Sequence, residues 1–206
     1  MIEQLEETAG RDVPRETFEL LERFAALLRE EATRQNLVAA STIHNLWERH
    51  ILDSAQLVRY EPHAGAAWID IGAGAGLPGL VVAALCEGPI LLVEPRRLRA
   101  NFLERAVAEL GLADRVTVLA AKAEKAAGQF DVITARAVAR LDRFLELSTH
   151  LSTKNSIWVL PKGRSARSEL DEARRSWQCE AQSVPSRTDP ESEILLLRRV
   201  KAKGKR

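Results

Sequence analysis

The sequence predicts an α/β fold with a mostly parallel, seven-stranded sheet, a C-terminal antiparallel hairpin and an N-terminal helical extension. Three observations support this prediction. A short apolar stretch at 68–71 runs directly into a glycine-rich turn at 72–79. Five strand-like stretches alternate with helical patterns between residues 68 and 160. Two further strand-like stretches follow, separated by the turn-rich segment 185–190, so we expect the sheet to close with a hairpin.

The stretch 68–79, with the sequence WIDIGAGAGLPG, is typical of a nucleotide-type binding site. Its first residues predict a buried strand, and the apolar residues that follow it predict a helix packed on the sheet. Glycines allow the backbone to approach a ligand, and the free N–H groups at the start of a helix attract a negatively charged group. Gly74, Gly76 and Gly79 match the dinucleotide pattern G-x-G-x-x-G, but the turn already begins at Gly72.

A carboxylate follows the next strand. Residues 90–93 predict that strand, and it ends in Glu94. A carboxylate at this point, about 20 residues after the glycines, is placed to bind ribose hydroxyls. The arrangement suits NAD and S-adenosylmethionine equally, so these residues leave both ligands open.

The N-terminal part predicts a helical extension, residues 1–60, packed on a core of residues 61–206. Amphipathic helices are expected over 13–34 and 44–59, because apolar residues recur there at helical spacing. We expect these helices to bury their apolar faces against the core.

Arg49, His50 and Asp53 lie on or beside the polar face of the second helix. Arg49 and Asp53 are spaced i,i+4, and His50 and Asp53 are spaced i,i+3, so their side chains can meet on the helix surface. From the residues alone, we interpret them as a surface ion pair beside a solvated histidine.

The remaining elements alternate as a parallel sheet requires. They are a basic helix at 96–111, strands at 116–119 and 130–136, a helix at 138–150, a strand at 156–160, a helix at 165–177 and closing strands at 179–184 and 192–200. Arg136 lies at the carboxyl end of its strand, where ligands bind in open α/β sheets. We therefore expect Arg136 to be functional.

The closing hairpin helps to choose between the two ligands. Dehydrogenases built from two nucleotide-binding halves end with another βα repeat. A hairpin after five β–α units fits a methyltransferase sheet better.

The composition constrains the partners little. The 206-residue chain has 30 Lys and Arg against 29 Asp and Glu, whereas its tail, 198–206, carries six bases and no acid. Such a tail suits an anionic partner and a disordered end equally well. Cys86 and Cys179 lie far apart without a histidine cluster, so we expect no zinc site, no other metal and no disulfide. No signal peptide or membrane span is expected, which predicts a cytoplasmic protein, and we expect a monomer because no feature suggests oligomerisation.

Several groups of residues carry a resemblance to a known family. They are Asn36-Leu37, Arg49-His50 with Asp53-Ser54, the turn from Asp70 to Gly79, Arg136-Ala137 and Lys162-Gly163. On these residues the chain resembles the 16S rRNA guanine-N7 methyltransferase family, also named RsmG, GidB or glucose-inhibited division protein B. The combination is specific, because a Gly-x-Gly-x-Gly-Leu-Pro-Gly turn with an upstream Arg-His-x-x-Asp-Ser is not a general methyltransferase pattern.

The resemblance implies a Rossmann-like class I methyltransferase that uses S-adenosyl-L-methionine. It implies as substrate N7 of one guanine near the decoding region, in free 16S rRNA or in the small ribosomal subunit. The residues expected to bind the cofactor are Gly72, Gly74, Gly76, Leu77, Glu94, Ala123, Glu124 and Arg136. Glu94 stands where the family often has Asp, and Ala73 replaces a commoner Thr or Ser.

Methylation of guanine N7 requires alignment more than proton transfer. N7 has an in-plane lone pair and no proton, so no general base is needed, and positioning can supply most of the acceleration. Arg136 and Lys162 are the candidates for orienting the guanine through O6 or for contacting phosphates. The resemblance also favours a functional role for Arg49 and His50 over a surface ion pair. The residues that we expect to contact RNA are Arg49, His50, Arg96 and Lys162.

Other functions stay open from the sequence. They are a small-molecule methyltransferase with the same core, an NAD(P)-binding protein and a non-enzymatic RNA-binding protein that uses the basic tail. The stretch after the fourth strand lacks an Asn/Asp-Pro-Pro-aromatic motif, which argues against methylation of an exocyclic amine. It also lacks Pro-Cys, which argues against covalent attack on a pyrimidine.

Overall fold

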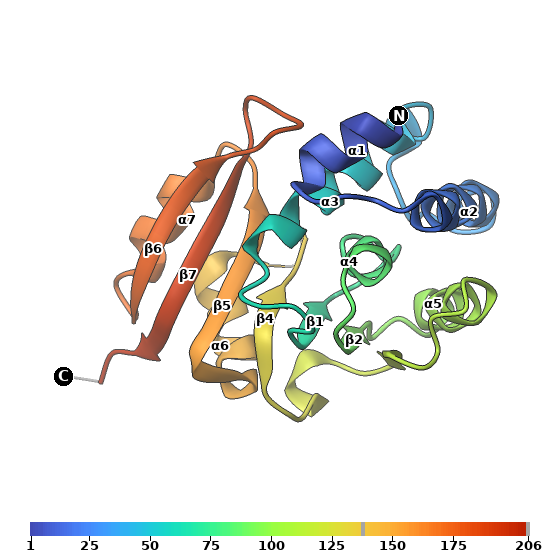
Figure 1. The fold of residues 1–206 in the computed structure, drawn as a ribbon. Helices are drawn as coiled ribbons and strands as arrows, with labels where there is room; N and C mark the ends of the chain where they lie inside the picture. The colour runs from blue at the N-terminus through green and yellow to red at the C-terminus, as the bar shows by residue number, and fades with distance from the viewer. Residues whose placement is uncertain (137–138, 205–206) are drawn as a thin grey trace.

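One seven-stranded sheet forms the centre of the chain in a computed structural model that describes residues 1–136 and 139–204 (Figure 1). The strands are β1 (Trp68–Ile71), β2 (Ile90–Val93), β3 (Val116–Leu119), β4 (Phe130–Thr134), β5 (Ser152–Lys162), β6 (Trp177–Pro185) and β7 (Glu193–Ala202). Their order is β3-β2-β1-β4-β5-β7-β6. The first five strands pair in parallel, whereas β7 runs antiparallel between β5 and β6. The predicted sheet with its closing hairpin is therefore confirmed.

Helices cover both faces of this sheet (Figure 1). They are α4 (Gly79–Leu85) and α5 (Arg97–Glu109) on one face, and α6 (Leu141–Ser148) and α7 (Ala166–Ala173) on the other. The alternation of side chains along a strand explains the two layers. In β5, Ile157 and Val159 join the apolar cluster on the α4 side, whereas Trp158 and Leu160 join the cluster on the α6 side.

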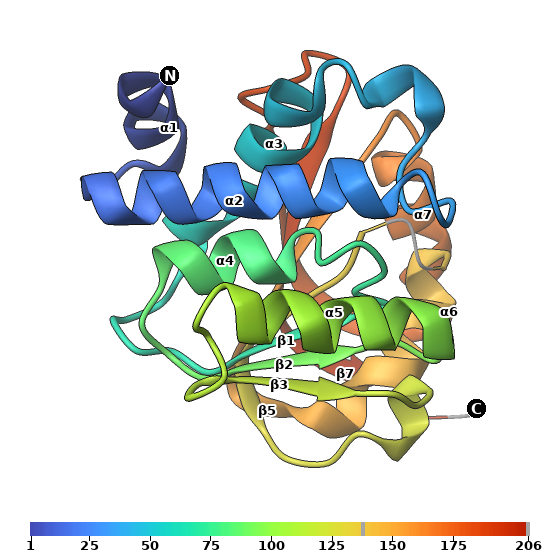
Figure 2. The same cartoon turned by 90° about the vertical axis from the view of Figure 1, so that its right-hand side faces the viewer.

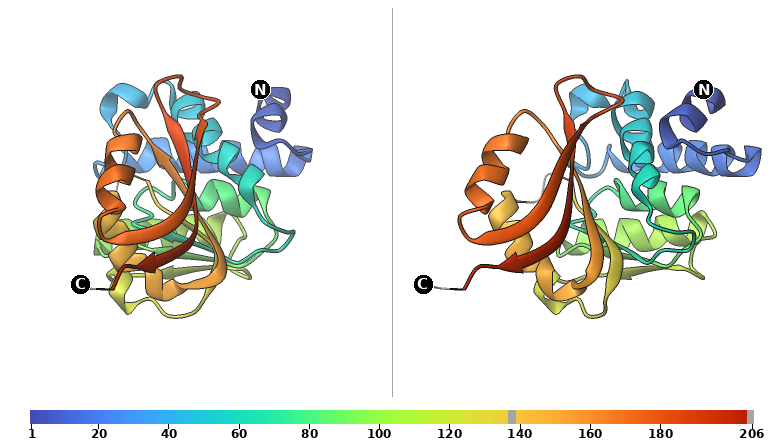
Figure 3. Two further views of the ribbon diagram at one scale, coloured as in Figure 1. Left: turned by 90° about the vertical axis from the view of Figure 1, so that its left-hand side faces the viewer. Right: turned by 60° about the vertical axis from the view of Figure 1, so that its left-hand side comes forward.

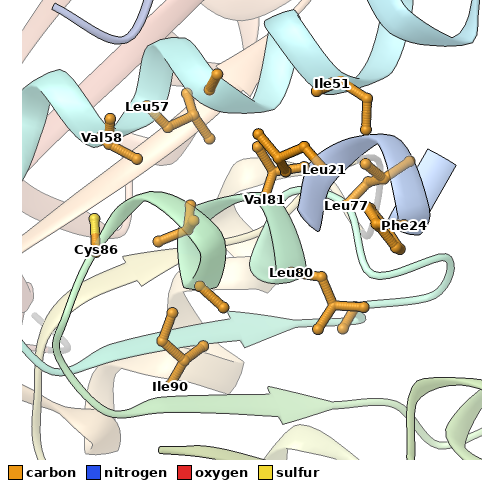
Figure 4. Packing of buried hydrophobic residues seen from close by; sticks show 14 of the residues in the cluster. Leu21, Phe24, Ile51, Leu57, Val58, Leu77, Leu80, Val81, Cys86 and Ile90 are labelled. Atoms are coloured by element: carbon orange, nitrogen blue, oxygen red, sulfur yellow. The ribbon is translucent and has the colours of Figure 1, made fainter. Parts of the chain in front are cut away.

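The N-terminal helices form a further layer outside α4 (Figure 2). They are α1 (Ile2–Ala9), α2 (Arg15–Glu31) and a helical segment at 47–60, which is π-helical over Trp47–Leu52, α-helical over Asp53–Ala55 (α3) and 3-10 helical over Gln56–Tyr60. Leu21 and Phe24 of α2 share one apolar cluster with Ile51 and with Leu77 and Val81 of the core (Figure 4). The two predicted amphipathic helices are confirmed apart from their ends, whereas α1 is absent from the sequence prediction.

The basic tail belongs mostly to the sheet. Residues 198–202 are the last part of β7, and Arg199 forms an ion pair with Glu180 of β6 at 2.8 Å. The alternative of a disordered end is therefore wrong for residues 198–202, and the strand predicted at 192–200 continues to Ala202. Four positions used in the sequence analysis lie outside the described residues. They are Ala137 of a matched motif, Val138 at the start of a predicted helix, and residues 205–206 of the basic tail.

Three further expectations concern absent features. Within residues 1–136 and 139–204, no helix is long and apolar enough to cross a membrane. No group of three or more His, Cys, Asp or Glu residues in those ranges is arranged to hold a metal ion. Cys86 and Cys179 are both free, and Cys86 is buried.

Candidate active site

The glycine turn after β1 bends the chain across the end of β2. The N–H groups of Gly72 and Ala73 donate to the carbonyl of Val93 at 2.7 and 3.0 Å. Gly72 has a φ of 74° and Gly74 a φ of 52°, which are conformations that side chains disfavour. The glycines are therefore needed for the turn itself, and they leave its backbone accessible to a ligand.

Glu94 is fixed against this turn. The side chain is only 3% exposed. Its Oε2 accepts the N–H of Gly74 at 3.0 Å, and its Oε1 accepts the N–H of Arg96 at 2.8 Å. Each carboxylate oxygen keeps a further lone pair. Glu94 can therefore accept hydroxyl hydrogens from a ligand without moving.

A cavity of about 470 Å³ opens beside the turn, a size that is typical of small-molecule sites. Its lining includes the predicted residues Gly72, Gly74, Leu77, Glu94, Arg96, Ala123, Glu124 and Arg136. Ile71, Val93 and Leu147 add apolar walls. A carboxylate for ribose hydroxyls, a bare backbone turn and apolar walls are what an adenosine group requires. The residues present therefore fit the nucleoside part of S-adenosylmethionine.

Gly76 belongs to the same turn but has a packing role. Its φ is 82°, and a Cβ at this position would lie 2.6 Å from Cδ1 of Leu80 and 3.2 Å from Cδ2 of Leu103. Its contacts therefore lie with α4 and α5 rather than with the cavity. Its lack of a side chain lets the turn pack closely against these helices.

The segment 35–37 after α2 closes one side of the cavity, and it is missing from the predicted cofactor residues. Leu37 lines the cavity. The side chain of Gln35 donates to the carbonyl of Leu98 at 3.2 Å, and Arg99 donates to the carbonyl of Asn36 at 2.9 Å. Each of these contacts spans 63 residues of sequence, so no local pattern reveals them.

A second cavity, of about 480 Å³, lies at the carboxyl ends of β4 and β5. Its lining includes Asp53, Gln56, Arg136, Arg140, Lys162, Glu169 and Ser186. Arg136 lines both cavities and therefore lies at their junction. Lys162, the other predicted guanine-orienting residue, lines the second cavity.

Two side chains of the 47–60 helical segment hold Arg136. Its Nη1 donates to Nδ1 of His50 at 3.0 Å and lies 3.6 Å from Oδ2 of Asp53. The surface interpretation of Arg49, His50 and Asp53 is therefore wrong in two respects. His50 is buried, with 9% of its surface exposed. Asp53 pairs with Arg136, whereas Arg49 pairs with Asp189 at 3.3 Å.

The hydrogen bonds of His50 assign its tautomer. A guanidinium can only donate, so Nδ1 of His50 accepts and the proton lies on Nε2. Nε2 donates to the hydroxyl of Thr42 at 2.8 Å, and that hydroxyl donates to the carbonyl of Ala39 at 2.8 Å. Burial, reinforced by the charges of Arg136 and Arg49, lowers the pKa of His50 to about 4. A neutral imidazole therefore orients the guanidinium.

Lys162 lies in the second cavity with a partner. Its Nζ donates to Oε2 of Glu169 at 2.8 Å, and the hydroxyl of Ser165 donates to Oε1 at 2.7 Å. Burial acts to raise the pKa of Glu169, but the hydrogen bonds from Lys162 and Ser165 outweigh it and lower that pKa. The ammonium charge of Lys162 on the cavity wall is therefore balanced by the Glu169 carboxylate.

Asp70 lies beneath the glycine turn and is 1% exposed. Its Oδ2 accepts the N–H of Gly79 at 2.8 Å, while its Oδ1 has no hydrogen-bond partner among the described residues. Burial raises the pKa of Asp70 to about 7, although the Gly79 N–H and Arg136 oppose the rise. The residue fixes the start of α4 and titrates near neutral pH.

The family model of rRNA small subunit methyltransferase G (GidB) matches residues 17–195 of the chain. The "Ribosomal RNA small subunit methyltransferase G" of Rhizorhabdus wittichii is 48% identical over 196 residues, which cover 94% of this chain and 90% of the relative. The protein of the same name from Sphingopyxis alaskensis is 51% identical over 178 residues, which cover 85% and 76%.

Solved structures share the fold at low sequence identity. A SAM-dependent methyltransferase from Aquifex aeolicus aligns with a TM-score of 0.59 at 14% identity, covering 75% of this chain and 92% of that one. A TehB-like SAM-dependent methyltransferase from Corynebacterium glutamicum aligns with a TM-score of 0.58 at 14% identity, covering 78% and 95%. The predicted Rossmann-like class I fold is therefore confirmed.

Proposed function

The chain belongs to the rRNA small subunit methyltransferase G family, and we propose that it transfers a methyl group from S-adenosylmethionine to N7 of one guanine in 16S rRNA. The observation that carries this proposal is the pair of cavities that meet at Arg136. One cavity has the groups that a nucleoside requires, and the other has room for a base. Family membership also selects S-adenosylmethionine over NAD, the two ligands that the glycine pattern leaves open.

In the first cavity, the glycine turn and Glu94 would hold the methyl donor. When bound, S-adenosylmethionine supplies a methyl group carried on a positively charged sulfur. Glu94 would accept the ribose hydroxyls, because its position is fixed by backbone N–H groups. Ala123 and Glu124 would border the adenine, since they line the same cavity from the loop after β3.

In the second cavity, the protein would orient the guanine. N7 carries no proton, so the transfer depends on alignment and needs no general base. Arg136 can donate to guanine O6 while N7 stays free. The charged groups of this cavity support such a role, because Lys162 is paired with Glu169 and Asp53 with Arg136. We assign them to orientation rather than to proton transfer.

The RNA contacts need one change from the sequence prediction. Arg49 and Arg96 are exposed, and Arg96 borders the first cavity, so we keep them as contacts for the RNA backbone. His50 is buried behind Arg136, so we assign it to orienting Arg136 instead of to RNA. The target guanine would have to leave its stack to enter the second cavity.

The proposal is tested by transfer of labelled methyl from S-adenosylmethionine to small ribosomal subunits. The acceptors are subunits from cells that lack this gene, and subunits from wild-type cells are the control. We expect label only in the former, at a base that becomes sensitive to borohydride and aniline cleavage. Label at a base resistant to that cleavage would contradict N7 as the target. Label in soluble metabolites and in no RNA would favour the small-molecule alternative.

We also propose that the protein acts in the cytoplasm as a monomer and without a metal ion. The support is chemical, since methyl transfer to N7 requires neither deprotonation nor a Lewis acid. Enzyme that is stripped with EDTA and then assayed on intact subunits in their Mg²⁺ buffer should therefore keep its turnover, and the free protein should sediment as a single chain. Loss of activity on stripping that added Zn²⁺ or Mn²⁺ restores would contradict the metal-free mechanism.

A further inference from the structure

The loop at the tip of the β6–β7 hairpin lies against the 47–60 helical segment (Figure 3). Gln56 of that segment is 1% exposed, although its side chain is polar. Its Oε1 accepts the N–H of Arg187 at 2.8 Å. Its Nε2 lies 3.1 Å from the hydroxyl of Ser186 and 3.2 Å from that of Thr188. A buried amide with this many partners ties the loop firmly to the segment.

The same loop reaches Asp53. The hydroxyl of Thr188 donates to Oδ1 of Asp53 at 2.8 Å, and Nε2 of Gln56 donates to the same oxygen at 2.9 Å. With Oδ1 held from two directions, the carboxylate has one orientation. That orientation turns its other oxygen, Oδ2, toward Arg136 at 3.6 Å.

We propose that Thr188 and Gln56 are positioning residues for methyl transfer, which act on Arg136 through Asp53. The inference rests on the proposed function, in which Arg136 orients the guanine at the junction of the two cavities. His50 holds the guanidinium from one side, and the Asp53 carboxylate holds it from the other. A misplacement of about 1 Å in an orienting group can reduce a rate by about two orders of magnitude. The hairpin loop is therefore part of the catalytic apparatus, although it comes 50 residues and more after Arg136 in the sequence.

Thr188→Val tests the proposal, because it removes the hydroxyl and keeps the shape of the side chain. We expect kcat for methylation of small subunits to fall about tenfold, since one hydrogen bond to a charged group is lost. The affinity for S-adenosylmethionine should stay within about twofold. Thr188→Ser restores the hydroxyl and should recover most of kcat. Thr117→Val, an exposed strand position in β3, is the matched control and should resemble the wild type.

A double-mutant cycle with Asp53→Asn shows whether Thr188 acts through Asp53. We expect Thr188→Val to have little further effect on kcat in the Asp53→Asn background, because the carboxylate that it orients is already gone. The same tenfold loss in both backgrounds would show that Thr188 acts elsewhere. Full activity of Thr188→Val beside an active wild type would overturn the proposal.

A second measurement does not depend on the RNA substrate. The charge of Arg136 contributes to the lowered pKa of His50. If Thr188→Val loosens Arg136, the pKa of His50 in an NMR titration should rise toward its ordinary value, while Thr117→Val should leave it unchanged. An unchanged His50 titration in Thr188→Val would overturn the proposal even if the wild type methylated another substrate. If the wild type methylated no RNA but the pKa of His50 still rose in Thr188→Val, only the proposed function would be overturned.

Discussion

At Gly74, a side chain would lie among residues that line the first cavity, where we propose that S-adenosylmethionine binds. A Cβ at this position would lie 3.6 Å from Nη1 of Arg99, 3.6 Å from the carbonyl oxygen of Gly72 and 3.9 Å from Oε2 of Glu94. All three of these residues line the first cavity. We expect Gly74→Val to weaken S-adenosylmethionine binding by about two orders of magnitude, measured by calorimetry.

Gly111 is the matched control for this substitution. Its φ of 68° is also positive, but no atom lies within 4 Å of its Cβ position. Both Gly74→Val and Gly111→Val should lose about 1–2 kcal/mol of stability to backbone strain. Only Gly74→Val should lose cofactor affinity. An equal loss of affinity in both variants would mean that strain, rather than occupied space, causes the effect.

His50 and Asp70 contribute oppositely to the pH dependence of the free energy of unfolding. Burial lowers the pKa of His50 from 6.5 to about 4, so the unfolded chain binds more protons in that window and stability rises with pH. Burial raises the pKa of Asp70 from 3.8 to about 7, so the folded chain binds more protons there and stability falls with pH. The His50 effect amounts to about 3 kcal/mol and the Asp70 effect to about 4 kcal/mol, so the two largely cancel in the wild type.

Single substitutions should reveal this cancellation. His50→Gln removes the His50 effect, so its stability relative to the wild type should fall as pH rises from about 4 to about 6.5. Asp70→Asn removes the Asp70 effect, so its stability relative to the wild type should rise from about pH 4 to about pH 7. Urea unfolding at both ends of each window measures the differences. Parallel stability profiles for the three proteins would contradict both assignments.

For single residues, the sequence predicts the role of those whose partners lie nearby in the chain. Gly72, Gly74 and Glu94 lie at two neighbouring strand ends, so a short motif with a known spacing was sufficient to identify them. The partner of His50 is Arg136, 86 residues later. Helix spacing alone suggested only surface contacts for His50, and the family motif grouped it with Arg136 without indicating that the two side chains touch.

At the scale of elements, one buried carboxylate holds α2 against α5. Glu31 at the end of α2 is 6% exposed, and it accepts hydrogen bonds from Arg105 of α5 at 2.6 Å and from Gln35 at 2.7 Å. Burial acts to raise the pKa of Glu31, but the bonds from Gln35 and Arg105 outweigh it and lower that pKa. Because Leu37 of the segment 35–37 lines the first cavity, this ion pair also supports the cavity wall.

Arg105→Met should therefore affect both stability and binding. It leaves Glu31 with Arg34 at 3.5 Å as its remaining cation, which should lower the free energy of unfolding by about 2 kcal/mol. S-adenosylmethionine affinity should weaken several-fold, because the segment after α2 is less well held. Arg15→Met breaks an exposed pair with Glu19 and should change stability by less than about 1 kcal/mol. Equal losses in the two variants, measured by urea unfolding, would contradict the structural role of Glu31.

Strands were easier to predict than helices. In β7, Ile194 and Leu196 face one apolar cluster and Leu195 and Leu197 face the other, so a continuous apolar run marks a strand covered on both sides. In α1 the buried residues are Leu5, Thr8 and Ala9, which form too short an apolar pattern to predict the helix from sequence. The winding changes from π to α to 3-10 along 47–60, and apolar spacing does not encode such a change.

At the scale of the whole molecule, the predicted extension and core share one apolar cluster. Residues of α1, α2 and the 47–60 segment belong to the same cluster as residues of β1, α4 and α5. Arg11 adds polar links, donating to the carbonyl of Val58 at 2.6 Å, to Glu61 at 3.0 Å and to the carbonyl of Leu85 at 3.1 Å. We therefore propose that residues 1–60 and 61–206 unfold as one unit.

Removal of residues 1–34 should then abolish cooperative folding of the remaining chain. It uncovers the surfaces of α4, α5 and the 47–60 segment against which α2 packs. It also removes the buried side chains of Leu21, Phe24 and Leu28, each of which contributes about 1.5–3 kcal/mol. Their sum is comparable with the total stability of about 5–15 kcal/mol that is typical of a domain. Removal of residues 1–10 takes away fewer buried side chains, so that variant should melt at a lower temperature but still in one transition. Circular dichroism and calorimetric melting compare the three chains. The fragment 35–206 could instead melt in one transition within a few degrees of the full chain. That result would show that α4 is stable in water without α2, and that the extension is a separate domain.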